Sequence, residues 1–100
     1  MRNKDLKTGM LVETRGGHKG IVLCNFDNTF MTGERVISFP KDEIWERLDE
    51  FTPRLKFKKQ RSLTKKEVRA LDIMRVWSAS SVVKTMKLST QDRLLLWERA

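Results

Sequence analysis

Two short strand-like runs on either side of a glycine turn constrain the fold more than any other feature of this sequence. Apolar and polar side chains alternate along Met10–Arg15, which is the pattern of a half-buried strand. Lys19–Phe26 is a second run, rich in β-branched residues and bounded by turn residues. Because Gly16 and Gly17 lie between the two runs, the sequence predicts a β-hairpin.

The strand-like character continues to residue 39. Thr29–Thr32 and Glu34–Phe39 both resemble strands, and Asp27-Asn28 supplies the turn before them. Gly33 marks either a bulge or another tight turn. The first forty residues are therefore predicted to be β.

Pro40 begins a stretch of different character. Lys41–Glu50 has its acids early, and Ile44, Trp45 and Leu48 form one apolar stripe at helical spacing. This pattern predicts a short amphipathic helix or a single helical turn that starts near the proline. We expect Trp45 to pack that helix onto the sheet.

The second half of the chain mixes helix and strand signals. Thr64 with Glu67 three residues later is a capping box, so a helical turn is expected to begin there. Ile73–Trp77 suits a strand by alternation. The periodicity leaves open whether residues 64–77 are helix or strand throughout, because three apolar residues would also line one helix face: Val68, Leu71 and Met74. Leu94–Trp97 is a compact apolar run that we expect to complete the core.

The positive charge is concentrated in Arg54–Arg69, which we call the basic segment. It holds eight Lys or Arg residues against one acid. The net charge is −1 over residues 1–50 and +9 over residues 51–100. A chain with net charge +8 favours an acidic partner, most simply nucleic acid, although an acidic protein surface would satisfy the same charge. The candidate binding residues are Arg54, Lys56, Lys58, Lys59, Arg61, Lys65, Lys66 and Arg69.

Leu55 and Phe57 alternate with the first bases of this segment, as in an edge strand or an extended arm. Lysines on an edge strand also prevent two sheets from pairing, so part of the charge has a structural explanation. Phe57 has two interpretations: it stacks on a single-stranded base, or it is buried in the core.

The inventory of reactive side chains favours a protein without catalytic activity. One histidine, His18, and one cysteine, Cys24, make a Cys–His pair improbable and a four-ligand zinc site unattainable from Cys and His alone. His18 is expected in a solvated turn and Cys24 as a buried, inert thiol. Gly16, Gly17 and Gly20 lack the spacing of a phosphate-binding loop, so we expect no catalytic residue, no metal and no cofactor.

A single domain over residues 1–100 is expected, since this length supports one modest core. One cysteine rules out an internal disulfide and fits a reducing cytoplasm. Met1–Thr8 lacks the apolar core of a signal peptide, and no apolar stretch approaches the roughly 20 residues that cross a bilayer. We therefore expect a cytoplasmic protein with no membrane partner; the oligomeric state is left open.

Five short motifs, in this order, resemble a family of small phage and prophage proteins of Gram-positive bacteria. They are DLKTGM (Asp5–Met10), VETR with its glycine turn (Val12–Gly16), IVL (Ile21–Leu23), DIMRVW (Asp72–Trp77) and LLWER (Leu95–Arg99). The resemblance implies a mainly β (α+β) fold: a small SH3-like β-barrel with one or two short helices inserted in the middle. Residues 40–69 have no counterpart in the family, so they are interpreted as a variable helical and basic insertion.

On the same resemblance, Asp72–Trp77 and Leu94–Arg99 are strands that pair with Met10–Arg15 and Lys19–Asn25 to close the barrel. Trp77 and Trp97 would then belong to the core. Trp-Glu-Arg also occurs earlier, at residues 45–47, and the copy at residues 97–99 is taken as the barrel strand.

Three functional hypotheses follow. The first is a non-catalytic phage or mobile-element protein, in the cytoplasm of a bacterial host, that binds nucleic acid or a ribonucleoprotein through the basic segment with little sequence specificity. The second is an inhibitor of a host defence enzyme, for example an anti-CRISPR protein, that binds its target protein directly. The third is a solvated basic face without a dedicated ligand.

Overall fold

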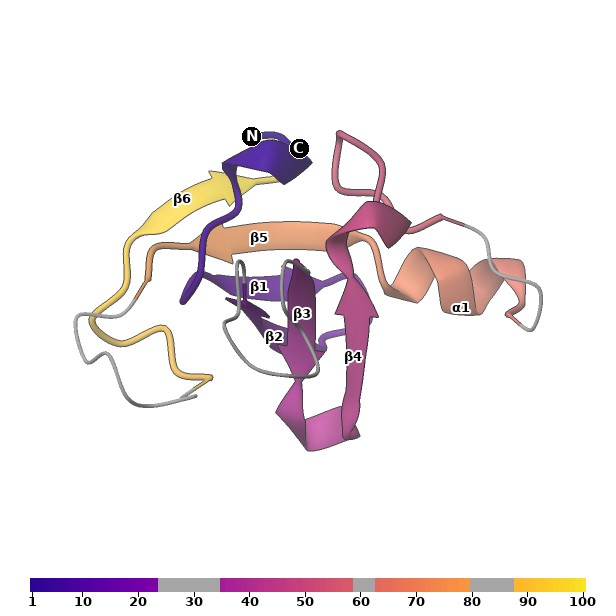
Figure 1. The fold of residues 1–100 in the computed structure, drawn as a ribbon, viewed down its shortest axis with the longest axis horizontal. Coiled ribbons are helices and arrows are strands. Elements are labelled where there is room, and N and C mark those ends of the chain that lie inside the picture. Colours follow the sequence, from indigo (N-terminus) through magenta and orange to yellow (C-terminus); the bar gives the residue numbers. More distant parts are fainter. Residues whose placement is uncertain (24–34, 59–62, 80–87) are drawn as a thin grey trace.

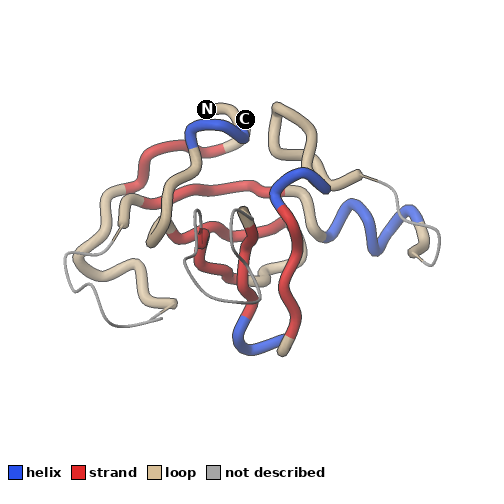
Figure 2. Tube along the Cα trace, viewed as in Figure 1, coloured by secondary structure: helices blue, strands red, loops and turns tan. Residues whose placement is uncertain are grey.

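In the computed structural model, which describes residues 1–23, 35–58, 63–79 and 88–100, the fold is built on one antiparallel sheet. Its strand order is β4-β3-β2-β1-β5-β6 (Figures 1 and 2). The strands are β1 (Leu11–Thr14), β2 (Lys19–Leu23), β3 (Val36–Phe39), β4 (Ile44–Arg47), β5 (Ile73–Trp77) and β6 (Leu95–Glu98). Within these ranges no pairing joins β4 to β6, so they form the two edges of the sheet.

Helical structure is limited to short pieces in the described ranges. One six-residue α-helix, α1 (Lys65–Ala70), precedes β5. Single 3₁₀ turns occur at η1 (Asn3–Asp5), η2 (Pro40–Asp42) and η3 (Leu48–Glu50). The prediction of a mainly β protein with little helix is therefore confirmed.

The predicted hairpin is β1 and β2. Leu11 lies opposite Ile21 and Glu13 lies opposite Lys19 in an antiparallel register. Gly17 closes the turn with a φ of +85°, a conformation that a residue with a Cβ rarely adopts. The glycines between the two alternating runs therefore serve as the sequence pattern indicated.

Residues 64–77 divide into a helix followed by a strand. The Thr64 side chain accepts a hydrogen bond from the Glu67 amide at 3.2 Å, which is the predicted cap. The chain then leaves the helix at Leu71 and becomes β5, which pairs with β1 as expected. β6 pairs with β5 alone in the described ranges.

Of the two alternatives for Lys41–Glu50, the single helical turn near Pro40 is confirmed as η2, and the longer amphipathic helix is wrong. Glu43 has a φ of 54°, which ends η2 after one turn. The next four residues then form β4, in which Ile44 lies opposite Phe39. An apolar pattern of Ile44, Trp45 and Leu48 fits a strand as well as a helix. The hydrogen bonds to β3 make the segment a strand. Trp45 is 51% exposed and does not pack onto the sheet as predicted.

The core lies against the central strands and includes Leu55, Phe57 and Val68 of the basic segment. Phe57 meets Phe51 edge-to-face with 5.1 Å between ring centroids, so burial, and not stacking on a base, is its role. Leu55 is buried beside them. The core residues are Leu6, Val12, Val22, Ile37, Phe39, Leu48, Phe51, Leu55, Phe57, Val68, Ile73 and Val76.

The run Leu94–Trp97 contributes less to the core than predicted. Trp97 packs against the core cluster, but the three leucines before it are between 46% and 73% exposed. Within the described ranges β6 is an edge strand with only β5 beside it, which leaves about half or more of each of these side chains exposed. Trp77, also expected in the core, is half-buried. The predictions for Cys24, Asp27-Asn28, Thr29–Thr32 and Gly33 fall outside the described residues.

Candidate nucleic-acid interface

In the described residues 54–58 and 63–69, the basic segment is an irregular loop and the helix α1, held so that buried apolar side chains point inward and Lys and Arg side chains point outward. Thr52 and Lys56 fix the first turn, because the Thr52 amide donates to the Lys56 carbonyl at 2.8 Å and the Lys56 amide donates to Thr52 Oγ1 at 3.1 Å. Leu55, at the turn, has a φ of 68° and enters the core. The candidate binding residues that the structure describes are all exposed: Arg54, Lys56, Lys58, Lys65, Lys66 and Arg69. Lys59 and Arg61 lie outside the described residues.

Few of these cations are neutralised by a carboxylate. Arg69 Nη1 lies 3.9 Å from Asp72 Oδ2, and Lys58 Nζ donates to the backbone carbonyl of Asp49 at 2.7 Å. Within the described ranges the side chains of Arg54, Lys56, Lys65 and Lys66 have no ion pair, so their charge faces solvent.

Asp72 joins the loop, the helix and the first hairpin from a buried position. Its side chain is 1% exposed, and Oδ1 accepts a hydrogen bond from the Phe57 amide at 2.9 Å. Among the described residues Oδ2 has no hydrogen-bond partner, and it lies 3.9 Å from one guanidinium nitrogen each of Arg15 and Arg69. A cavity of about 330 Å³ lies beside it, between Phe57 and α1. The carboxylate therefore fixes where the segment passes into the sheet.

Arg99 anchors the beginning of the segment from the other end of the chain. Its Nη2 donates to the carbonyls of Arg54 and Ile73 at 2.8 and 2.9 Å, and its guanidinium stacks over Trp97, 5.0 Å from the ring centroid. Burial lowers the pKa of Arg99, and the nearby Asp72 carboxylate opposes that shift. In the sequence Arg99 stands out only as part of the LLWER motif, which gives no sign of this role.

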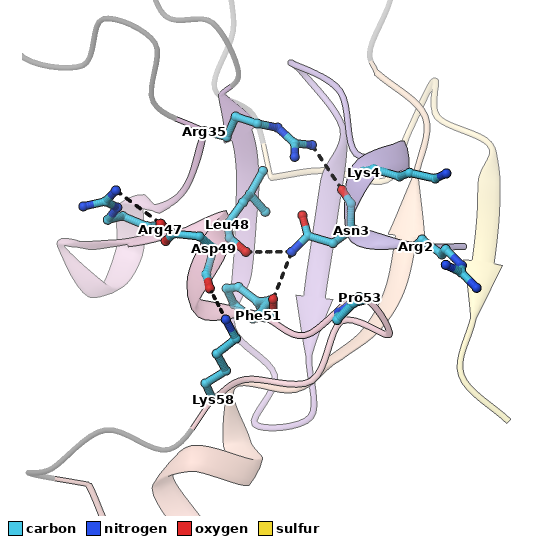
Figure 3. A pocket seen from close by; sticks show the side chains of 10 residues that line it. All are labelled: Arg2, Asn3, Lys4, Arg35, Arg47, Leu48, Asp49, Phe51, Pro53 and Lys58. Carbon is cyan, nitrogen blue, oxygen red and sulfur yellow. Dashed lines mark hydrogen bonds and ion pairs between the residues drawn. The ribbon is translucent and has the colours of Figure 1, made fainter.

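A further group of cations surrounds a cavity of about 620 Å³, which we call the N-terminal cavity (Figure 3). The ten residues that line it come from η1, the chain before β3, the end of β4 with η3, and the basic segment. They are Arg2, Asn3, Lys4, Arg35, Arg47, Leu48, Asp49, Phe51, Pro53 and Lys58. Of these, only Lys58 was among the candidate binding residues, because the other four cations belong to the half of the chain whose net charge is close to zero.

Asn3 holds the walls of the N-terminal cavity together. Its Nδ2 donates to the carbonyls of Leu48 and Phe51 at 2.6 and 3.1 Å. The backbone carbonyl of Asn3 accepts a hydrogen bond from Arg35 Nη2 at 3.1 Å, and Arg35 Nη2 also donates to the backbone carbonyl of Leu6 at 3.1 Å. The cavity is thus shaped by hydrogen bonds to backbone groups, which leave the positive charge of Arg35 without a carboxylate partner in the described ranges.

Two further titratable groups of the described ranges make contacts within the fold, His18 and Arg75. The turn histidine His18 is half-buried, and its Nδ1 lies 3.1 Å from Asp42 Oδ1. Arg75 contacts Glu98 and Glu13, and these hydrogen bonds raise its pKa. Among the described residues no group of three or more His, Cys, Asp or Glu side chains is placed to hold a metal ion.

Comparison of the chain with protein-family models, with curated proteins and with solved structures finds no match. No helix in the described part of the chain is long and apolar enough to cross a membrane.

Proposed function

We propose that this chain is a non-catalytic accessory protein of a phage or another mobile element, and that it binds nucleic acid or a nucleoprotein through the basic segment. Its scaffold in this proposal is the small SH3-like barrel that the family resemblance implies. The observation that carries the proposal is that all six described candidate residues are exposed and that, within the described ranges, only Arg69 among them has an ion pair. Phosphate contacts require Lys or Arg side chains that have no acidic partner and are held on a well-supported surface.

The proposal is tested by titrating fluorescent oligonucleotides, single- and double-stranded, at several salt concentrations. If about six Lys or Arg side chains contact phosphate, the slope of the logarithm of the binding constant against the logarithm of the salt concentration is about −4 for single strands and about −5 for duplex DNA. A variant with Lys56→Gln, Lys65→Gln and Lys66→Gln, here the segment variant, should bind more weakly and with a smaller slope. Salt-independent binding by the parent, or equal binding by the variant, would refute the proposal.

Exposed apolar side chains on both edge strands favour a second candidate, inhibition of a host defence enzyme by direct protein binding. Ile44 and Trp45 on β4 are 43% and 51% exposed, and the leucines on and before β6 are exposed too. A host enzyme that is retained from nuclease-treated lysate by the parent and the segment variant, but lost on Trp45→Ala or Leu95→Ala, would favour this candidate over nucleic-acid binding.

A further inference from the structure

The N-terminal cavity has a charge balance unlike that of an ordinary surface hollow. Five cations line it and the only acid is Asp49. That carboxylate is already paired with Arg47 at 3.2 Å. Arg35 and Lys58 donate to backbone carbonyls, which satisfy hydrogen bonds but cancel no charge. The lining therefore retains a net positive charge that favours an anion.

The arrangement of the charged groups indicates what kind of anion fits. In Figure 3 Arg47 points away on one side of the cavity, Arg2 and Lys4 lie on the other, and Lys58 lies below. Such a spread does not converge on one small anion. It suits a chain of anionic groups that passes across the cavity.

The size of the cavity bears on which nucleic acid it can take up. A hollow of about 620 Å³ has the size of a small-ligand pocket, so it can admit part of a single strand but cannot enclose a double helix. Of the three apolar residues that line it, Pro53 is exposed, whereas Leu48 and Phe51 are almost fully buried. Proteins that bind single strands without sequence preference follow the backbone with a positively charged groove.

We propose that the N-terminal cavity binds the phosphodiester backbone of a single-stranded nucleic acid, which continues from Lys58 onto the basic segment. The inference rests on the proposed function and extends the interface to Arg2, Lys4, Arg35 and Arg47, all outside the basic segment.

The test compares variants that each lose three positive charges. The cavity variant carries Arg2→Gln, Lys4→Gln and Arg47→Gln, which spares the structural hydrogen bonds of Arg35. The distant variant carries Lys7→Gln, Lys19→Gln and Lys41→Gln, none of which lines the cavity. A charge-conserving variant carries Arg2→Lys, Lys4→Arg and Arg47→Lys. Circular dichroism and urea denaturation establish that each is folded, and fluorescence anisotropy measures binding to a dT12 strand, a 12-base-pair duplex and a labelled poly-glutamate.

Three lost contacts should reduce the salt slope for dT12 by about 2 and lower affinity about tenfold to hundredfold near 0.1 M salt. The distant variant should show a much smaller loss, and the charge-conserving variant should bind like the parent. Duplex affinity should be alike in the cavity and distant variants.

Four results would overturn the inference. If the cavity and distant variants bind dT12 equally while the segment variant loses affinity, the cavity is not part of the interface and the proposed function stands. An equal loss for strand and duplex removes the preference for single strands. Tighter binding of poly-glutamate than of dT12 assigns the cavity to an acidic protein. A parent that binds neither nucleic acid refutes the proposed function together with this inference.

Discussion

Asp72 shows how one side chain can decide the local path of the chain. It is buried, it receives the Phe57 amide, and its second oxygen faces two guanidinium groups without a hydrogen bond. Asp72 belongs to a strand motif in the sequence, but nothing in its neighbours along the chain indicates that its side chain is buried. The partners that stabilise it come from residues 15, 57 and 69 and meet only in the folded protein.

Asp72→Ala should lower the free energy of unfolding by about 1–3 kcal/mol, because the buried Phe57 amide then has no acceptor. Urea denaturation followed by circular dichroism measures this. Asp49→Ala is the control, since it removes an exposed carboxylate whose pair with Arg47 is worth at most about 1 kcal/mol. Equal destabilisation by the two substitutions would mean that the buried hydrogen bond is unimportant.

Among the secondary-structure elements, those with local signals were predictable and those chosen by tertiary contacts were not. The hairpin follows from alternation around Gly17, and α1 begins where its capping box indicates. β4 has no such signal. Its four residues carry a pattern compatible with helix or strand, and only the neighbouring β3 makes the strand preferable.

Thr64→Ala removes the cap of a helix that is only six residues long. We expect a loss of about 1 kcal/mol in the free energy of unfolding and faster amide hydrogen exchange within α1. Thr64→Ser retains the hydroxyl and serves as the control. Unchanged exchange in the alanine variant would show that packing of Val68, and not the cap, holds the helix.

Glu46 on β4 should make stability depend on pH. Burial, and to a lesser extent the charge of Glu50, raise the pKa of Glu46 above 4.5 in the folded state. The folded state therefore binds this proton more tightly than the unfolded state. Protonated Glu46 therefore makes its full contribution to the free energy of unfolding below pH 4.5, and this contribution is lost as the pH rises through the pKa of Glu46 in the folded state.

Glu46→Gln should consequently be more stable than the parent at pH 7, and the difference should disappear below pH 4.5. Urea denaturation at a series of pH values between 3.5 and 7 measures both curves. Glu43→Gln changes an exposed carboxyl next to the same strand and provides the comparison. A difference that stays constant with pH would contradict the assignment.

At the scale of the whole molecule, the charge distribution along the chain differs from that in space. Residues 1–50 carry a net charge of −1, yet Arg2, Lys4, Arg35 and Arg47 meet beside Lys58 around one cavity. Counting charges along the sequence identifies the basic segment but not this cluster. The mainly β class and the exposure of the basic segment were therefore predictable, whereas the cavity depends on which turns the sheet brings together.

A net charge of +8 on 100 residues implies self-repulsion in the folded state. We expect the melting temperature of the free protein to rise as sodium chloride increases from about 10 to 150 mM, because the Debye length shrinks from about 30 Å to about 8 Å. Differential scanning fluorimetry measures the shift. The segment variant, with net charge +5 after three of the eight excess charges are removed, should show a smaller rise. A fall in melting temperature would mean that attractive ion pairs dominate.

The turn at Pro53 and Arg54 is held from both ends of the sequence. The Asn3 amide donates to the Pro53 carbonyl at 3.0 Å, and Arg99 donates to the Arg54 carbonyl at 2.8 Å. Figure 1 shows the two chain ends close together above the sheet. During synthesis on the ribosome, a nascent chain has its basic residues long before it has Arg99. The turn at Pro53 and Arg54 therefore gains its second anchor only once Arg99 has been made.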